Sequence, residues 1–75
     1  MGCKIMKTKT IELVFMDNTN QGYIIIHDRR GEKSINRIMR EYPNVQFIIL
    51  YDPPISRLNE KMLKLVRSIC SESQF

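Results

Sequence analysis

The sequence predicts an α+β fold, a ββαβα two-layer sandwich in which two helices cover one face of a three-stranded, mostly antiparallel sheet. Two short runs of strand-forming residues, joined by a polar turn, indicate a hairpin. Two later segments with apolar residues at helical spacing flank a third, strongly apolar run. The chain of 75 residues is long enough for one domain, and its 43% apolar and 27% charged residues are typical of a folded protein.

The hairpin is predicted over residues 10–27. Residues 10–16 place Ile11, Leu13 and Phe15 at a period of two, as a half-buried strand does. Residues 17–22 are Asp, Asn, Thr, Asn, Gln and Gly, which favour turns and are too polar to bury. The β-branched run at residues 23–27 follows, so the two strands should pair antiparallel.

The first helix is predicted over residues 32–42, with Asp28 capping its start and Pro43 ending it. Residues 45–51 then form a third strand that is apolar on both faces. This strand could lie parallel beside the second strand or pair antiparallel with the first. We prefer the antiparallel position, because such an apolar run favours a covered place in the sheet.

The second helix should begin after Ser56 and run for roughly fifteen residues. Its apolar stripe consists of Leu58, Met62, Leu65, Val66 and Ile69. We expect residues 1–8 to be a flexible lead, residues 9–70 to be the single α+β domain, and residues 71–75 to be a C-terminal tail.

Cys3 and Cys70 are the two cysteines of the chain. No apolar leader precedes them, so we expect a cytoplasmic protein with both thiols reduced. Metal binding needs more ligands than these cysteines and His27 supply, and no apolar run is long enough to span a membrane. The sequence therefore predicts no metal, no cofactor and no membrane partner.

Catalysis is not indicated either. His27 is the sole histidine and follows an apolar strand, a place typical of a hydrogen-bonding residue rather than a general base. Asp17, Asp28 and Asp52 also follow strands, where ligands for metal-dependent phosphodiester chemistry are often found. Their neighbours are those of caps and turns, however, so we predict a protein that is not an enzyme.

A row of cations is the most informative surface of the sequence. Cations recur at intervals of three, four and three residues: Arg30, Lys33, Arg37 and Arg40. This spacing stacks side chains on one face of a helix. The opposite face is apolar and consists of Ile35, Ile38, Met39 and Tyr42.

The cationic row and the net charge of +4 predict nucleic-acid binding, with RNA or a single strand favoured over duplex DNA. Arginine supports this hypothesis because its planar guanidinium pairs bidentately with phosphate. Arg29 lies at the start of the row. Lys61 and Lys64 would extend the surface if the two helices lie side by side.

An apolar sheet face left without a helix predicts a homodimer. With both helices on one face, the other face would collect Val14, Met16, Ile24, Ile26 and Ile48. Such a patch is larger than a monomer usually exposes. The alternative function is that of a protein-binding inhibitor or antitoxin-like factor, of phage or mobile-element type, that uses this face or an edge strand for its target.

Overall fold

The computed structural model of the chain describes residues 2–72. Its strands are β1 (Cys3–Lys7), β2 (Ile11–Met16), β3 (Gln21–Ile26) and β4 (Gln46–Tyr51). Its helices are the 3₁₀ helix η1 (Arg29–Ser34), α1 (Ile35–Glu41) and α2 (Arg57–Glu72). The predicted hairpin, both helices and the last strand are confirmed, with bounds within a few residues of those expected.

The sheet of the described chain has the strand order β1-β2-β3-β4. The first three strands pair antiparallel, whereas β4 lies parallel to β3, with Ile26 opposite Tyr51. The α+β class is therefore confirmed, but the predicted three-stranded sheet is wrong, since these residues form a mixed sheet of four strands. The preferred antiparallel position of the last strand is also wrong, because β4 pairs with β3.

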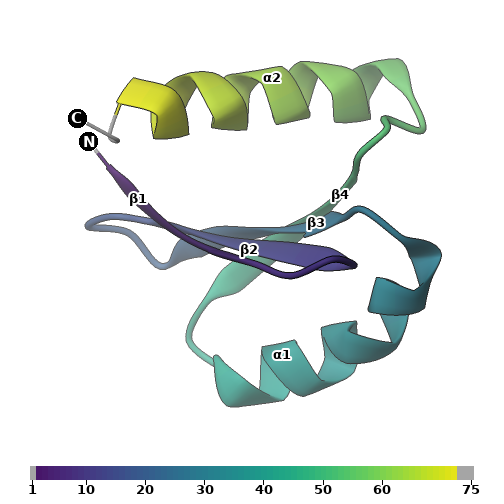
Figure 1. Ribbon diagram of the computed structural model, residues 1–75. Helices are drawn as coiled ribbons and strands as arrows, with labels where there is room; N and C mark the ends of the chain where they lie inside the picture. The colour runs from purple at the N-terminus through teal and green to yellow at the C-terminus, as the bar shows by residue number, and fades with distance from the viewer. Residues whose placement is uncertain (1, 73–75) are drawn as a thin grey trace.

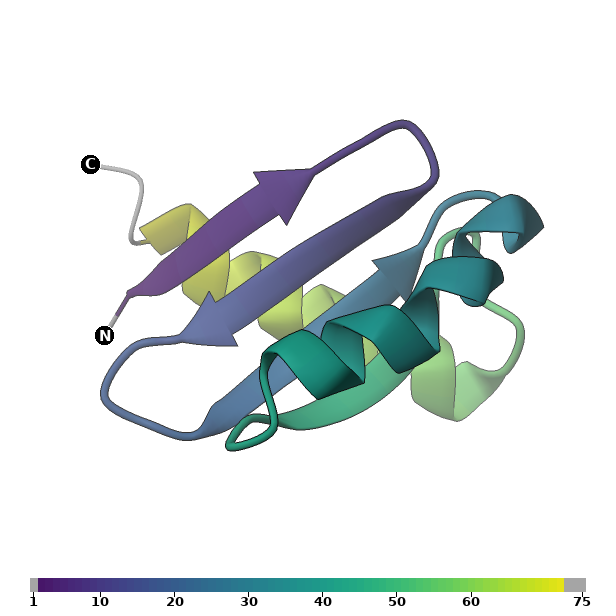
Figure 2. The ribbon, with the colours of Figure 1, turned by 90° about the horizontal axis from the view of Figure 1, so that it is seen from below.

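The two helices lie on opposite faces of the sheet, α2 on one side and α1 on the other (Figure 1). Figure 2 shows α1 in front of the strands, with α2 behind them. The predicted placement of both helices on one face is wrong. The physical reason is the composition of β3, whose consecutive residues Ile24, Ile25 and Ile26 alternate between the two faces and are all buried. Both faces are apolar at this strand, so each needs a cover.

Each face of the sheet has its own core. Under α2, the buried residues are Val14, Tyr23, Ile25, Leu50, Leu63, Val66 and Cys70. Under α1, they are Ile11, Leu13, Ile24, Ile26 and Ile38, with Phe15, Tyr42 and Phe47 in tilted or edge-on ring contacts around them. Two helices thus bury a small sheet from both sides.

Strand β1 comes from the segment 1–8, which we expected to be a flexible lead. Its Ile5 pairs with Val14 of β2, and Cys3 and Ile5 pack against the core under α2. At the other end of the domain, residues 71 and 72 of the expected tail belong to α2, and residues 73–75 lie outside the described residues.

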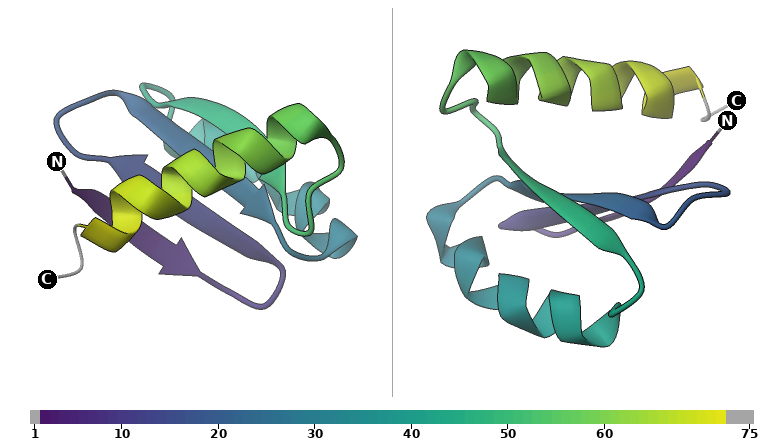
Figure 3. Two further views of the ribbon diagram at one scale, coloured as in Figure 1. Left: turned by 90° about the horizontal axis from the view of Figure 1, so that it is seen from above. Right: turned by 180° about the vertical axis from the view of Figure 1, so that it is seen from behind.

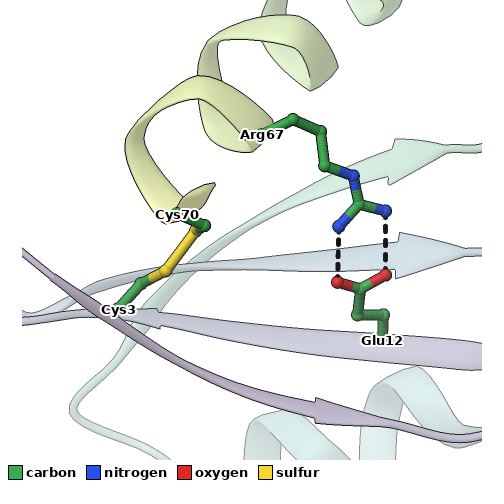
Figure 4. Close-up of a disulfide and its surroundings, with 4 residues drawn as sticks. All are labelled: Cys3, Glu12, Arg67 and Cys70. Atoms are coloured by element: carbon green, nitrogen blue, oxygen red, sulfur yellow. Dashed lines mark hydrogen bonds and ion pairs between the residues drawn. A yellow bond between two sulfur atoms is a disulfide. The ribbon is translucent and has the colours of Figure 1, made fainter. Parts of the chain in front are cut away.

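A disulfide joins Cys3 of β1 to Cys70 of α2 (Figure 4). The two Cα atoms are 5.6 Å apart although 67 positions separate them in the sequence. The expectation of two reduced thiols is therefore wrong. The fold brings the two cysteines together because α2 runs back across the sheet toward the start of β1 (Figure 3).

The predicted cap at Ser56 is confirmed, whereas Asp28 caps the 3₁₀ helix η1 rather than α1, which begins after Ser34 without a side-chain cap. The Asp28 carboxylate accepts a hydrogen bond from the backbone N–H of Arg30, and the Ser56 hydroxyl accepts one from the N–H of Asn59. Gly31 is buried against β2, where an added Cβ would lie 2.8 Å from the carbonyl oxygen of Thr10. The chain therefore needs glycine at this close approach.

Candidate functional site

The cations of the predicted row lie on η1 and α1. Arg29, Arg30 and Lys33 come from η1, and Arg37 and Arg40 come from α1; all five are exposed. Ile38 anchors the inner side and is 4% exposed. The row is therefore open to solvent on a segment that the apolar core holds in place, while Arg37 also lines a pocket against β1 and β2, and Arg29 lines one at the ends of β3 and β4.

Two of these arginines are paired with neighbouring acids. The Arg30 guanidinium donates to both carboxylate oxygens of Asp28, with the shortest contact at 2.7 Å, and this pairing lowers the pKa of Asp28 to about 2. Arg37 Nε lies 3.9 Å from Glu41 Oε1. Both pairs are solvent-exposed, so each contributes little free energy and a competing anion can replace the acid.

The remaining three cations of the row have no acidic partner within residues 2–72: Arg29, Lys33 and Arg40. The neighbouring Glu32 is engaged on the sheet side, where its carboxylate accepts a hydrogen bond of 3.0 Å from the hydroxyl of Tyr51. That bond raises the pKa of Tyr51 and holds Glu32 toward β4. The row thus keeps a positive balance on its outer side.

Lys61 and Lys64 do not join this surface. Both lie on α2, which covers the opposite face of the sheet (Figure 1). Lys64 Nζ also lies 3.6 Å from Glu60 Oε1. The expectation of one continuous cationic surface across both helices is wrong, because it required the helices to share a face.

The expected apolar interface on an open sheet face is also wrong for most of its residues. Val14, Ile24 and Ile26 are at most 2% exposed, and Met16 is half-buried against the core under α2. Ile48 differs from them, with 46% of its surface exposed. Covering the second face with α2 removed the patch but left the edge of the sheet at β4 open.

Exposed apolar side chains gather at this edge instead. A groove of about 220 Å³ lies between β4 and the start of α2, and its walls include Ile48, Ile55, Leu58 and Met62. Ile55 and Leu58 are 66% and 70% exposed. The apolar stripe of α2 predicted from the sequence explains this surface. The side of α2 that packs on the sheet carries Leu63, Val66 and Cys70, so Leu58 and Leu65 of the predicted stripe stay exposed.

The free edge of β4 is capped at one end. The side-chain amide of Asn59 accepts a hydrogen bond of 2.7 Å from the backbone N–H of Tyr51 and donates one of 2.8 Å to its C=O. Asn59 is 6% exposed and comes from the first turn of α2. The sequence analysis did not single out this residue, although a polar residue within an otherwise apolar helix face signals a buried partner.

A buried ion cluster lies on the same side of the sheet as α2. Glu12 of β2 is 1% exposed and accepts two hydrogen bonds, of 2.6 and 2.9 Å, from the Arg67 guanidinium (Figure 4). His27 Nε2 lies 2.9 Å from Glu12 Oε1, the oxygen that also accepts the hydrogen bond from Arg67 Nη2. Asp52 completes the cluster, 3.7 Å from both His27 Nδ1 and Arg67 Nη2.

The hydrogen bonds from Arg67 are the main cause of the lowered pKa of Glu12, and they outweigh the burial that would raise it. Sequence reasoning missed Glu12, yet a charged residue between Ile11 and Leu13 of a buried strand requires a partner. The interpretation of His27 as a strand-end hydrogen-bonding residue is confirmed. Both of its ring nitrogens face carboxylates, Nε2 at 2.9 Å from Glu12 and Nδ1 at 3.7 Å from Asp52.

Beside this cluster, a pocket of about 240 Å³ lies at the carboxyl ends of the parallel strands β3 and β4. Such crevices often bind ligands in parallel sheets. Its lining mixes Arg29 with Asp28 and Asp52, so it presents no single charge. Among the described residues, no group of three or more metal-ligand side chains could hold an ion.

No helix in the described part of the chain is long and apolar enough to cross a membrane. Comparison with known proteins found no matching family model, no similar curated protein and no similar solved structure.

Proposed function

We propose that this protein is a small non-enzymatic regulator that docks nucleic acid through the cationic row of η1 and α1. The observation that carries the proposal is the position of five exposed cations on one anchored segment, three of them without an acidic partner in the described chain. Arginine supplies four of the five, and its guanidinium matches the geometry of a phosphate.

The exposed pairs of the row are compatible with this role. Phosphate competes with Asp28 for Arg30 and with Glu41 for Arg37 at little cost, because exposed ion pairs are weak. About five phosphate contacts on a single strand would give a slope of log affinity against log salt of about −3.5. The mechanism is occupancy, in which a rigid segment displaces counterions and holds or blocks the bound strand.

A single-stranded or structured RNA suits this surface better than a DNA groove. In a helix-turn-helix, the recognition helix has a partner helix that crosses the backbone beside it. In the described chain, α1 and α2 lie on opposite faces of the sheet, so they do not form such a pair.

The cytoplasmic location expected from the sequence rested partly on reduced cysteines, and the disulfide removes that argument.

Two matched charge reversals test the proposal. Arg37→Glu with Arg40→Glu changes the row on α1, and Lys61→Glu with Lys64→Glu makes the same change of charge on the opposite face. Each pair contains one residue with an i,i+4 acidic neighbour, so the two variants are closely comparable. The readout is fluorescence anisotropy with a labelled single-stranded RNA at low salt.

The α1 variant should lose roughly tenfold or more in affinity, whereas the α2 variant should lose less than about threefold through its net charge alone. Equal losses would contradict a role for the row. Failure of the wild-type protein to bind at low salt would contradict nucleic-acid binding itself.

A second candidate function is binding of a protein target through an edge strand. The open edge of β4, with its apolar groove, supports this alternative. Its other version, binding through an open sheet face, is incompatible with the burial of Val14, Ile24 and Ile26. A target protein bound at this edge would compete with any other strand that pairs with β4.

A further inference from the structure

We infer that β4 pairs with β4 of a second copy of this chain, antiparallel and around a twofold axis at Ile48. The pairing would join two sheets into one continuous sheet. In this register, Phe47 of each copy lies opposite Ile49 of the other, and the two Ile48 side chains meet at the axis. The inference concerns a different surface from the cationic row and does not depend on nucleic-acid binding.

The backbone of β4 provides the first argument. The backbone N–H groups of Gln46 and Asp52 donate to the carbonyls of Asn20 and Ile26, so the backbone groups of the even-numbered residues of β4 point toward β3. The direction of the backbone N–H and C=O groups alternates along a strand. The backbone groups of Phe47, Ile49 and Tyr51 therefore point away from β3, toward the open edge of the sheet. Asn59 occupies the outward groups of Tyr51. The open stretch is therefore Phe47 to Ile49.

The composition of β4 provides the second argument. The strand reads Gln-Phe-Ile-Ile-Leu-Tyr, with no charge and no proline. Proteins usually protect a free edge with charged residues, proline or a covering segment, because an unprotected edge adds another strand. A second copy brings an equally uncharged strand, so no like charges meet along the pairing.

The exposed apolar area provides the third argument. Four aliphatic residues that line the groove at β4 are between 37% and 70% exposed: Ile48, Ile49, Ile55 and Leu58. At roughly 200 Å² for a fully exposed residue they leave roughly 440 Å² of apolar surface open, as large as the largest patch of a typical monomer. A standard interface takes about 800 Å² from each partner. The rest of an interface of that size would come from backbone and polar atoms along the paired strands.

Two blocked positions select the register. An axis at Ile49 would pair Phe47 with Tyr51 of the second copy, whose backbone groups Asn59 already holds. An axis at Phe47 would pair Ile49 with Val45, whose N–H is donated to the carbonyl of Tyr42. An axis at Ile48 keeps both outward pairs open, and each pair exchanges two backbone hydrogen bonds.

The symmetry also has a consequence for the cationic row. A twofold axis perpendicular to a continuous sheet keeps each face on its own side. The two α1 helices would therefore share one face of the dimer, and the exposed α2 stripes would share the other. A dimer would present two cationic rows in the same direction and could hold one strand at two places.

Cysteine cross-linking tests the register. In a non-hydrogen-bonded antiparallel pair, opposite Cα atoms are about 4.5 Å apart, a separation that a disulfide bridges. Ile48→Cys should therefore form a covalent dimer under mild oxidation. Gln46→Cys is the control on the same strand and face, because the two copies of residue 46 would lie about 13 Å apart. Equal cross-linking of both variants, or none at Ile48→Cys, would overturn the inference.

A matched pair of lysine substitutions tests the surface itself. Ile48 and Met6 are both 46% exposed, but Ile48 lies on β4 and Met6 on β1, at opposite edges of the sheet. Sedimentation at about 100 µM should show a wild-type dimer, a monomeric Ile48→Lys and a dimeric Met6→Lys. Circular dichroism should show the native fold in all three.

A monomeric wild-type chain would overturn the inference, and so would a wild-type chain whose β4 pairs only with a different protein. Dissociation by Met6→Lys to the same extent would also overturn it, because the effect would then come from added charge. Loss of RNA binding in a chain that still dimerises would contradict the proposed function and leave the dimer intact.

Discussion

The two edges of the sheet, β1 and β4, are built in opposite ways. β1 carries Lys4 and Lys7, which oppose the addition of another strand, and a disulfide ties its first residue to the end of α2. β4 carries no charge, and the hydrogen bonds of Asn59 tie its last residue to the start of α2. Helix α2, which runs across the sheet (Figure 3), thus holds both edges, β1 by a covalent bond and β4 by two hydrogen bonds.

The difference shows which edge is available to a partner. A strand added at β1 would meet lysines, whereas a strand added at β4 would meet aliphatic side chains and free backbone groups. The attachments of α2 also differ in strength, so removing them one at a time should reduce stability by different amounts.

Removing the disulfide should have the largest effect. In the double variant Cys3→Ser with Cys70→Ser, a bond that closes a loop of 67 positions is lost, and the free energy of unfolding should fall by about 4 kcal/mol. Urea denaturation of the oxidised wild-type protein and the variant measures the difference. Wild-type protein unfolded with a reducing agent present should match the variant. Coincident transitions for the oxidised and reduced wild-type protein would show that the bond does not constrain the unfolded chain.

Arg67→Met should have the next largest effect. The substitution keeps most of the aliphatic packing but leaves the Glu12 carboxylate buried without its main partner, which should cost about 3 kcal/mol. Lys64→Met on the outer side of the same helix is the control, and its change should stay below about 0.5 kcal/mol. Similar losses for both variants would mean that helix α2 itself, rather than the ion pair, was disturbed.

Local patterns in the sequence predicted three of the four strands and both α-helices, but not their arrangement. Alternation and turn chemistry identified the hairpin, and Asp28, Pro43 and Ser56 marked the helix boundaries, because these signals act over a few residues. The assignment of helices to faces depends on the whole sheet. The run Ile24–Ile26 contained that information, since consecutive buried residues on one strand require a cover on both faces.

The candidate site was predictable only in part, for a similar reason. The spacing of the cations placed the row on one side of α1, but the relation of Lys61 and Lys64 to it required the three-dimensional fold. Strand β1 was missed because two lysines in five residues obscure its pattern. Glu12 and Asn59 bind partners that are distant in sequence or on the backbone, which periodicity does not show.

Asn59→Ala should have a smaller effect than the loss of either covalent or ionic attachment. It removes both hydrogen bonds to the Tyr51 backbone and should reduce the free energy of unfolding by about 2 kcal/mol. Asn36→Ala on the exposed side of α1 is the matched control and should be near neutral. The variant also frees the backbone N–H and C=O of Tyr51, which allows β4 to pair in other registers. In the Asn59→Ala background, the preference of cross-linking for Ile48→Cys over Gln46→Cys should therefore become smaller. Unchanged stability would mean that water replaces the side chain at this edge.

The smallest effect should come from protonating Glu12. Its pKa in the folded chain lies below the ordinary value of 4.5, chiefly because of the hydrogen bonds from Arg67. A lowered folded pKa gives stability that is fully present above about pH 4.5 and is lost as the pH falls through the folded pKa. The advantage of the wild-type protein over Glu12→Gln should therefore narrow below pH 4.5 in urea denaturation. Asp28 also has a lowered pKa but is present in both proteins, so the difference between them isolates Glu12. If the difference in unfolding free energy between the two proteins stays constant down to pH 3, the charge of Glu12 does not contribute to stability. The disulfide at one end of α2 and the hydrogen bonds of Asn59 at the other would then be the attachments that hold the helix to the sheet.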